Sequence, residues 1–238
     1  MKAMLLAAGE GTRLRPLTLA LPKPMVPVGG RPLLAYTLDL LRRHHVREVA
    51  INLHHCPDAV REYFSDGSAW GVRITYSFEP ELLGTAGAVK KLEPFWDGPF
   101  FILYGDNLTD CDLTRLAEFH QARGGLVTLG LYWRQDVEQS GVAALDEKDR
   151  ITGFVEKPAA GQAPGHWVFA GLMVAEPRLL EWIPPDRPCD FGREVLPELL
   201  ARGESVWGYR MTERLWWTDT LADYEALKRQ FDEGKLQL

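Results

Sequence analysis

The start of the chain constrains the fold most strongly. An apolar run over residues 2–8 leads directly into a loop that contains Gly9 and Gly11. A strand that opens into a glycine-containing loop is typical of open α/β sheets, which bind their ligands at the carboxyl ends of the strands. Bare backbone N–H groups in such a loop form a nest for anions. The sequence therefore predicts an α/β sheet with an anion site after its first strand.

Three cations follow in the same segment, namely Arg13, Arg15 and Lys23. The planar guanidinium group of arginine suits phosphate oxygens. Two common phosphate loops are excluded, because Leu14 stands where the dinucleotide fingerprint needs its third glycine and no Lys-Ser/Thr pair follows at the Walker spacing. We therefore expect a polyphosphate-binding loop of another kind.

Strand and helix patterns alternate along the rest of the chain. Strands are expected over 49–53, 72–78, 100–103, 126–131 and 167–174, a hairpin over 141–155, and helices over 33–44, 58–64, 86–92, 113–123, 190–202 and 224–233. This alternation predicts an α/β fold whose mostly parallel sheet has helices on both faces. With no linker, repeat or low-complexity segment, the prediction is a single domain over residues 1–238.

Composition excludes several classes of protein. A net charge of -6 argues against a general nucleic-acid binder, so the cations are interpreted as local to the first loop. The N-terminal apolar run is too short for a signal peptide, and no stretch approaches the length of a membrane span. The three cysteines lack a Cys-x-x-Cys pair, which indicates reduced thiols. We expect a cytoplasmic protein with neither nucleic acid nor membrane as partner.

Five segments in order carry a resemblance that covers nearly the whole chain. They are LAAGEGTRLRPLT with LPKPMVPVGGRPLL (6–18 and 21–34), EPELLGTAGA (79–88), FILYGDN (101–107), FVEKP (154–158) and WWTDT (216–220). Together they closely resemble the sugar-1-phosphate nucleotidylyltransferases, and the motifs are most similar to mannose-1-phosphate guanylyltransferases. The resemblance implies a Rossmann-like fold of the nucleotide-diphospho-sugar transferase type. It also leads us to expect no C-terminal β-helix domain, since the chain ends soon after the last predicted helix.

The resemblance also implies a reaction and its residues. A nucleotidyl group passes from a nucleoside triphosphate to a sugar 1-phosphate, and pyrophosphate leaves. The attacking phosphate oxygen is already anionic, since the second pKa of a phosphomonoester is about 6, so the reaction needs cations and a metal ion rather than a general base. The resemblance implies catalytic roles for Arg13, Lys23 and Lys157, and a Mg²⁺ ion held by Asp106 and Asp219. It implies nucleotide contacts for Ala8, Gly9, Gly11, Thr12, Arg13, Glu79, Gly84 and Thr85, and sugar-phosphate contacts for Glu156, Lys157 and Gly171.

Simpler interpretations of these residues stay open. Asp106 could cap a helix, Asp219 could be a turn residue, and Lys157 could be a solvated lysine at the end of a strand. Glu79 could face solvent at the end of its strand. Asp110 and Asp112 are interpreted as helix caps.

The preferred base follows from Glu79. A carboxylate accepts two parallel hydrogen bonds, which the N1–H and 2-amino groups of guanine can donate, whereas uracil and thymine offer a single N–H between carbonyl groups. We therefore expect GTP with mannose 1-phosphate or a related sugar phosphate. The alternatives are a uridylyl- or thymidylyltransferase acting on glucose-type or N-acetyl sugar phosphates, a phosphocholine cytidylyltransferase, and a regulatory homologue that binds nucleotide-sugars without catalysis. A homo-oligomeric assembly is left open.

Overall fold

The computed structural model describes residues 1–185 and 187–235. Its packing divides the chain into two compact units. Unit 1 comprises Met1–Leu82, Leu103–Cys111 and the chain from Glu213 onward, and unit 2 comprises Leu83–Ile102 and Asp112–Thr212. The single-domain organisation stays a prediction.

The sheet of unit 1 is parallel. Strands β1 (Lys2–Leu6), β4 (Glu48–Leu53) and β5 (Arg73–Phe78) lie side by side, with Leu6 paired to Asn52 and Asn52 paired to Ser77. Their carboxyl ends therefore lie at one edge of this sheet. The glycine loop follows β1 and Glu79 follows β5, so both predicted site segments begin at that edge.

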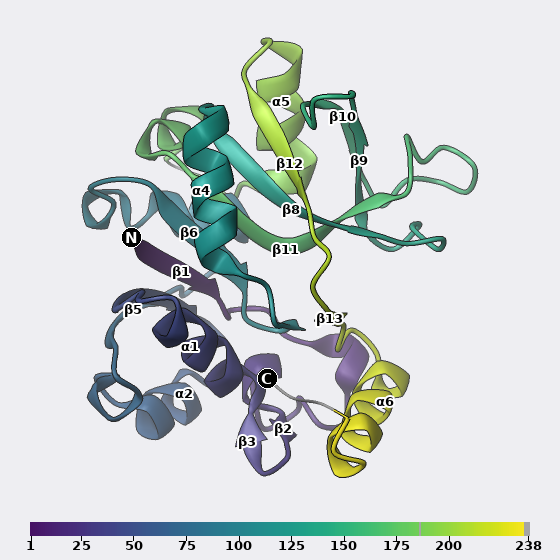
Figure 1. Ribbon diagram of the computed structural model, residues 1–238. Helices are drawn as coiled ribbons and strands as arrows, with labels where there is room; N and C mark the ends of the chain where they lie inside the picture. Colours follow the sequence, from purple (N-terminus) through teal and green to yellow (C-terminus); the bar gives the residue numbers. More distant parts are fainter. Residues whose placement is uncertain (186, 236–238) are drawn as a thin grey trace. The chain divides into compact units, whose positions relative to one another are not determined.

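Short elements surround this sheet. The helices of unit 1 are α1 (Leu33–Arg43), α2 (Pro57–Phe64) and α6 (Leu221–Asp232), with single 3₁₀ turns at Thr12–Leu14, Lys23–Met25 and Ser68–Trp70. Two small antiparallel pairs are β2 (Pro27–Val28) with β3 (Arg31–Pro32), and β7 (Leu108–Thr109) with β13 (Leu215–Trp216). Helix α6 begins with a capping box formed by Thr220 and Asp223 and lies beside β2 (Figure 1).

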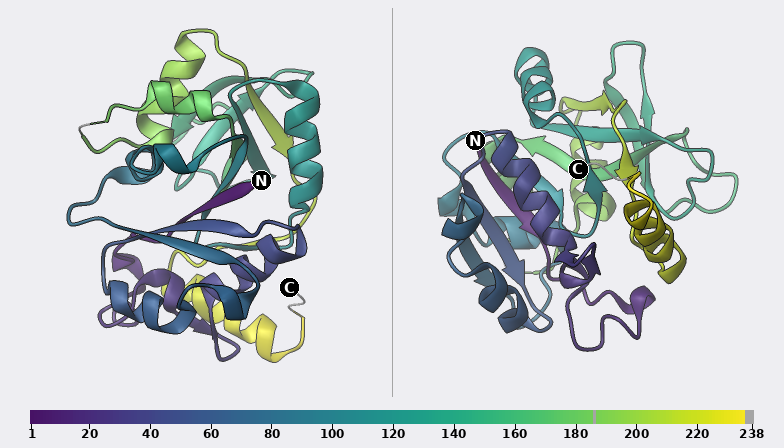
Figure 2. Two further views of the ribbon diagram at one scale, coloured as in Figure 1. Left: turned by 90° about the vertical axis from the view of Figure 1, so that its left-hand side faces the viewer. Right: turned by 60° about the horizontal axis from the view of Figure 1, so that its bottom comes forward.

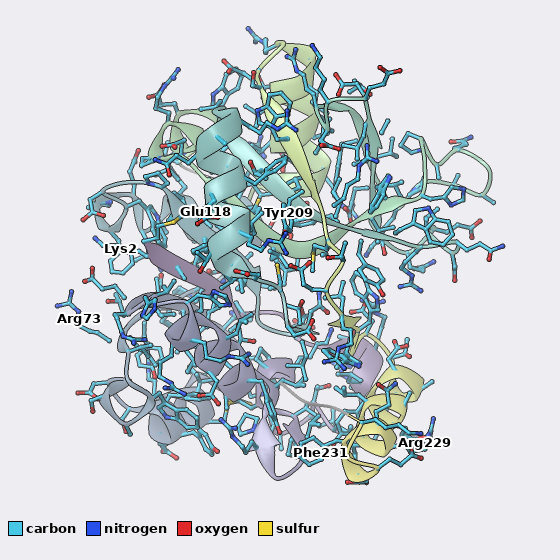
Figure 3. The ribbon with its side chains drawn as sticks, in the orientation of Figure 1. Lys2, Arg73, Glu118, Tyr209, Arg229 and Phe231 are labelled. Carbon is cyan, nitrogen blue, oxygen red and sulfur yellow. The ribbon has the colours of Figure 1, made fainter. Side chains whose placement is uncertain are left out.

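One apolar cluster joins segments of unit 1 that are distant in the sequence. Its buried members are Leu14, Val26, Val28, Leu33, Tyr36, Leu108, Tyr224 and Leu227, with Trp216 and Phe231 packed against them. Phe231 points from α6 toward the β2–β3 hairpin (Figure 3), where its ring fills the space that a side chain at Gly29 would need. The cluster thereby fixes the first loop, the chain after β6 and α6 relative to one another.

Unit 2 carries a mixed sheet. Strand β11 (Trp167–Ala175) pairs antiparallel with β8 (Val127–Trp133) and β9 (Gly141–Leu145), β9 pairs antiparallel with β10 (Ile151–Glu156), and β12 (Val206–Arg210) runs parallel to β8. Strand β6 (Phe100–Tyr104) contains the boundary at which the chain passes from unit 2 back into unit 1.

Three α-helices belong to the described part of unit 2. They are α3 (Gly84–Lys90), α4 (Leu113–Arg123) and α5 (Leu196–Ala201), with 3₁₀ turns at Glu93–Phe95 and Pro177–Trp182. Helix α4 lies along β8 and β12 (Figure 2), and the Phe119 ring meets the Tyr209 ring edge-on at 5.6 Å.

The α/β architecture with parallel strands is confirmed, with differences in detail. The helix expected over 190–202 is a π-helical turn, Phe191–Val195, followed by α5. Asp190 caps the segment by accepting the N–H groups of Gly192 and Arg193. Strand β12 was not predicted, and neither were the short strands β2, β3, β7 and β13. Among the helices of residues 1–185 and 187–235, none combines the length and the apolar character that a membrane crossing requires.

Candidate functional site

The loop after β1 folds back onto Lys23. Gly11 adopts a left-handed φ of 62°, and its carbonyl accepts a hydrogen bond of 2.7 Å from the Thr18 hydroxyl. A Cβ atom at Gly11 would lie 2.9 Å from the Cβ of Lys23. Glycine is therefore required here for conformation and for space. The predicted contacts of Ala8, Gly9 and Thr12 with a nucleotide stay predictions.

Lys23 lies between the two predicted metal ligands. Its Nζ atom is 2.7 Å from Oδ2 of Asp106 and 2.9 Å from Oδ1 of Asp219, and its side chain is 8% exposed. Arg13 reaches the same Asp219 oxygen at 3.2 Å. Burial by itself lowers the pKa of Lys23, but the two carboxylates outweigh burial and hold the pKa above its ordinary value. Four predicted residues, separated by up to 206 positions, thus form one charged cluster in unit 1, named here the Lys23 cluster.

The local structure explains how both aspartates reach this cluster. Asp106 follows β6, where the Gly105 N–H donates to the carbonyl of Leu6 at the end of β1, at 2.9 Å. The buried Thr218 hydroxyl donates to the Asp106 carbonyl. Because Thr218 directly precedes Asp219, this hydrogen bond places Asp219 beside Asp106.

The donor set of this cluster fits a magnesium ion. Mg²⁺ usually takes one or two protein carboxylates and completes its shell with water and phosphate oxygens. Oδ1 of Asp106 is buried and has no hydrogen-bond partner, so this carboxylate has unused capacity for a cation. Within the described chain, no group of three or more His, Cys, Asp or Glu side chains gathers as a ligand set.

Glu79 is buried, with 1% of its surface exposed, so the solvent-facing alternative is wrong. Its Oε1 atom accepts a hydrogen bond of 2.8 Å from the Asn52 amide, and its carbonyl lies 2.7 Å from Nδ1 of His54. The carboxylate is therefore covered in this structure, and its predicted contact with a nucleotide base stays a prediction.

Gly84 and Thr85 are tied to residue 190 within unit 2. The Thr85 hydroxyl donates to Oδ2 of Asp190 at 2.8 Å and accepts from the Phe191 N–H at 2.9 Å. Gly84 has a φ of 73°, and a Cβ there would lie 2.4 Å from the Cys189 carbonyl oxygen. The backbone of this segment is thus closely fitted to residues 189–191.

Glu156 lies in a space that two glycines leave open. A Cβ atom at Gly141 or Gly192 would lie 2.6 or 2.7 Å from its Oε2 atom. Burial raises the pKa of Glu156, and the nearby Asp190 carboxylate adds to this effect, while Lys157 opposes it. This carboxyl group is therefore held in a partly buried, acidic environment of unit 2.

Lys157 and Gly171 both have left-handed backbones. Lys157 is exposed with a φ of 50°, and its N–H donates to the Ser140 carbonyl at 3.0 Å. Gly171 has a φ of 73° and lies where the pairing of β11 with β8 shifts register, so glycine forms the bulge there. Their contacts with a sugar phosphate stay predictions.

The residues that contact predicted site residues include Asn52 and Asp190, which sequence analysis did not single out. Asn52 gave no signal beyond its place at the end of a strand. Asp190 gave one, because an aspartate before a helical pattern is a typical N-cap. The cap prediction is confirmed for Asp112, which accepts the Arg115 N–H, but it is wrong for Asp110, which forms an ion pair of 2.8 Å with Arg214.

Comparisons with known proteins identify the family of this chain. The family model described as "Nucleotidyl transferase" matches residues 2–228. A UTP–glucose-1-phosphate uridylyltransferase from Synechocystis sp. is 36% identical over 225 residues, which cover 89% of this chain and 58% of the relative. A mannose-1-phosphate guanylyltransferase from Mycobacterium tuberculosis is 35% identical over 219 residues, which cover 91% of this chain and 60% of the relative.

A solved structure extends the agreement to the fold. A candidate glucose-1-phosphate thymidylyltransferase from Bacillus anthracis, in complex with sucrose, matches with a TM-score of 0.87 at 22% identity, covering 96% of this chain and 94% of that one. The chain spans roughly three fifths of the length of the two curated relatives, as their covered shares of 58% and 60% show. From the match over residues 2–228 and these two relatives, the chain belongs to the nucleotidyl transferase family.

Proposed function

We propose that this chain is a cytoplasmic, magnesium-dependent enzyme that transfers a nucleotidyl group from a nucleoside triphosphate to a sugar 1-phosphate and releases pyrophosphate. The observation that carries the proposal is the Lys23 cluster, in which two cations and two carboxylates lie beside a glycine loop. Nucleotidyl transfer needs such a combination, because two anionic substrates must be brought together and charge develops on the leaving pyrophosphate.

In this proposal, Arg13 and Lys23 hold the triphosphate and the departing pyrophosphate. Asp106 and Asp219 hold Mg²⁺, which when bound neutralises charge on the phosphate oxygens. No side chain has to remove a proton from the nucleophile, since the sugar phosphate is ionised near neutral pH, its second pKa being about 6.

The acceptor is assigned to residues of unit 2. Lys157 neutralises the sugar phosphate, and its exposed side chain is accessible to a charged ligand. Glu156 hydrogen-bonds sugar hydroxyl groups, which suits a carboxyl group that is only partly exposed.

GTP with mannose 1-phosphate is the preferred substrate pair in this proposal. It rests on the two parallel hydrogen bonds that the Glu79 carboxylate can accept from guanine, and the 35% identity to a mannose-1-phosphate guanylyltransferase supports it. A second pair, UTP with glucose 1-phosphate, is supported by the 36% identity to a uridylyltransferase.

A substrate matrix tests the proposal. Four nucleoside triphosphates are each combined with mannose, glucose and N-acetylglucosamine 1-phosphates in the presence of Mg²⁺, and pyrophosphate release is measured. We expect release that depends on both substrates and is largest with GTP and mannose 1-phosphate. Faster use of UTP or dTTP than of GTP, by about tenfold, would show that the Glu79 argument is wrong. Absence of release from every pair would overturn the proposed activity itself.

A further inference from the structure

We propose that Lys23 is a resident counter-cation, which occupies the place between Asp106 and Asp219 until a divalent metal ion replaces it and frees it for the triphosphate. The inference rests on the proposed function, since that function assigns the metal ion to these aspartates. It adds an exchange of cations, with the consequence that metal ion and nucleotide bind cooperatively.

The contacts of Lys23 are the first step. Its ammonium group lies within 2.9 Å of one oxygen from each aspartate, and its side chain is buried. A metal ion that uses this carboxylate pair competes with the ammonium group, because both are cations bound by the same groups. Lysine is suited to release because its ammonium group is a compact charge on a flexible stem.

The position of Lys23 along the chain explains why the contact forms without a ligand. Lys23 begins a 3₁₀ turn and stands between Pro22 and Pro24, whose rings restrict the backbone. Its side chain is therefore aimed at the aspartates by a stiff segment, while the stem beyond Cβ keeps its rotatable bonds.

The charges of the cluster give the direction of coupling. Arg13 and Lys23 balance Asp106 and Asp219, so the described cluster is neutral as a whole. A divalent cation added alone leaves it with two excess positive charges, whereas a triphosphate added together with the ion compensates them. The metal ion by itself should therefore bind weakly. It should bind more tightly when phosphate oxygens of the nucleotide are present to pair with the displaced Lys23 ammonium group.

Unused capacity on the aspartate side points the same way. Oδ1 of Asp106 is buried without a hydrogen-bond partner even though Oδ2 holds the ammonium group. A buried polar atom without a partner is unfavourable. A cation with several coordination positions can satisfy both oxygens, which a single ammonium contact does not.

The test measures metal binding without nucleotide, using Mn²⁺ as the probe and calorimetry as the readout on the full chain. Lys23→Met removes the charge and keeps an apolar stem. We expect it to bind Mn²⁺ more tightly than the wild type, by about tenfold or more. Arg15→Met is the matched control, because it removes the same charge from the same loop and Arg15 is exposed. The control should bind Mn²⁺ as the wild type does.

A second measurement needs no variant at Lys23. In the wild type, acetylation of Lys23 by a soluble reagent is followed by mass spectrometry with and without Mg²⁺, and the exposed Lys148 serves as an internal reference. We expect Mg²⁺ to increase labelling of Lys23 and to leave that of Lys148 unchanged. If Mg²⁺ leaves Lys23 equally protected, or if Lys23→Met binds Mn²⁺ no more tightly than the wild type, the exchange is overturned.

The double variant Lys23→Met with Asp106→Asn locates the effect. Loss of the gain in Mn²⁺ affinity supports the aspartate pair as the site, and retention of the gain overturns it. These binding results are independent of turnover. If Lys23→Met binds Mn²⁺ more tightly but the wild type makes no nucleotide-sugar, the cation exchange is supported and the proposed function is overturned. If the wild type makes nucleotide-sugar but Lys23→Met binds Mn²⁺ no more tightly, only the cation exchange is overturned.

Discussion

The side-chain amide of Asn52 donates a hydrogen bond of 2.8 Å to Oε1 of Glu79, and both side chains are buried. The carbonyl oxygen of the same amide accepts the backbone N–H of Ala7 at 2.7 Å. Asn52 therefore links the end of β1, where the glycine loop begins, to the residue proposed to contact the base. If Glu79 contacts the base as proposed, Asn52 acts as a positioning residue for base selection.

Replacing Asn52 by Ala should weaken discrimination between GTP and ITP, which lacks the 2-amino group. If Glu79 accepts both donors of guanine, the wild type should prefer GTP in kcat/KM by about tenfold, the lower end of a bidentate base contact. Without the amide, the carboxylate loses its orientation and the ratio should fall toward one. Stability should also fall, by about 1–3 kcal/mol, because buried groups lose their partners.

Ser77→Ala is the matched control for this variant. Ser77 pairs with Asn52 across β4 and β5, is buried, and its hydroxyl has no hydrogen-bond partner. The control should keep the GTP to ITP ratio of the wild type. An unchanged ratio in Asn52→Ala would show that Asn52 acts on stability alone.

Asp106→Asn should reduce turnover by orders of magnitude while the chain stays folded. The amide keeps the shape of the side chain but removes the charge that both Lys23 and a metal ion need. Turnover at saturating Mg²⁺ and circular dichroism are compared with those of Asp112→Asn. Asp112 caps α4, and asparagine caps a helix equally well, so this control should stay active. Near-normal turnover of a folded Asp106→Asn chain would contradict its assignment.

Sequence analysis missed residues whose contacts depend on which strands and loops lie side by side in the fold. Asp106 and Asp219 were predicted from the resemblance of two short motifs, and the structure brings both to Lys23. Asn52 was missed because its importance depends on β4 lying between β1 and β5, and a strand sequence does not specify its neighbours. Burial of Glu79 was likewise not predictable, since residues that follow a strand are usually solvated.

Asp110 shows a further limit, because helix capping and ion pairing use the same side chain. A helix was expected to begin nearby, and Asp112 caps it. Asp110 instead accepts hydrogen bonds from the backbone N–H and the guanidinium group of Arg214. Only the pairing of β7 with β13 brings Arg214 to that position.

Lys157→Asn should raise the KM for the sugar 1-phosphate by about tenfold to a hundredfold, the loss expected for one charge-assisted hydrogen bond. Asparagine is preferable to alanine because Lys157 has a φ of 50°, which asparagine tolerates better. Nucleotide binding, measured by calorimetry without sugar phosphate, should stay unchanged. Lys148→Asn removes the same charge from the β9–β10 turn and should leave both quantities as they are. Lost nucleotide affinity in Lys157→Asn would show that Lys157 serves the nucleotide instead.

Gly84→Ala should destabilise the chain more than Gly161→Ala does. Both glycines have a φ of 73°, so both variants place alanine at a left-handed φ. A Cβ at Gly161 meets no heavy atom within 4 Å, whereas one at Gly84 lies 2.4 Å from the Cys189 carbonyl oxygen. The additional loss in the free energy of unfolding should be about 1–3 kcal/mol, measured by urea denaturation. Equal losses would show that residues 84 and 189 can separate without cost.

Stability should fall below pH 6.5 because of His120. Burial lowers the pKa of His120 in the folded chain, although Glu176 opposes this effect, and Nδ1 lies 2.8 Å from the Thr128 hydroxyl. As the pH drops below the ordinary value of 6.5, the unfolded chain takes up the proton first. Stability therefore declines from that pH down to the folded pKa, by at most about 1.4 kcal/mol per pH unit.

His120→Gln removes this titration. The free energy of unfolding of the wild type should therefore fall relative to that of the variant as the pH is lowered from about 7.5 to about 5.5. These two pH values lie about one unit on either side of the ordinary histidine pKa. Urea unfolding at both pH values gives the difference, in which the contributions of all other groups cancel. His166→Gln, at an exposed histidine of the same unit, is the control and should follow the wild type. A difference between wild type and His120→Gln that does not change with pH would show that His120 is protonated equally in both states.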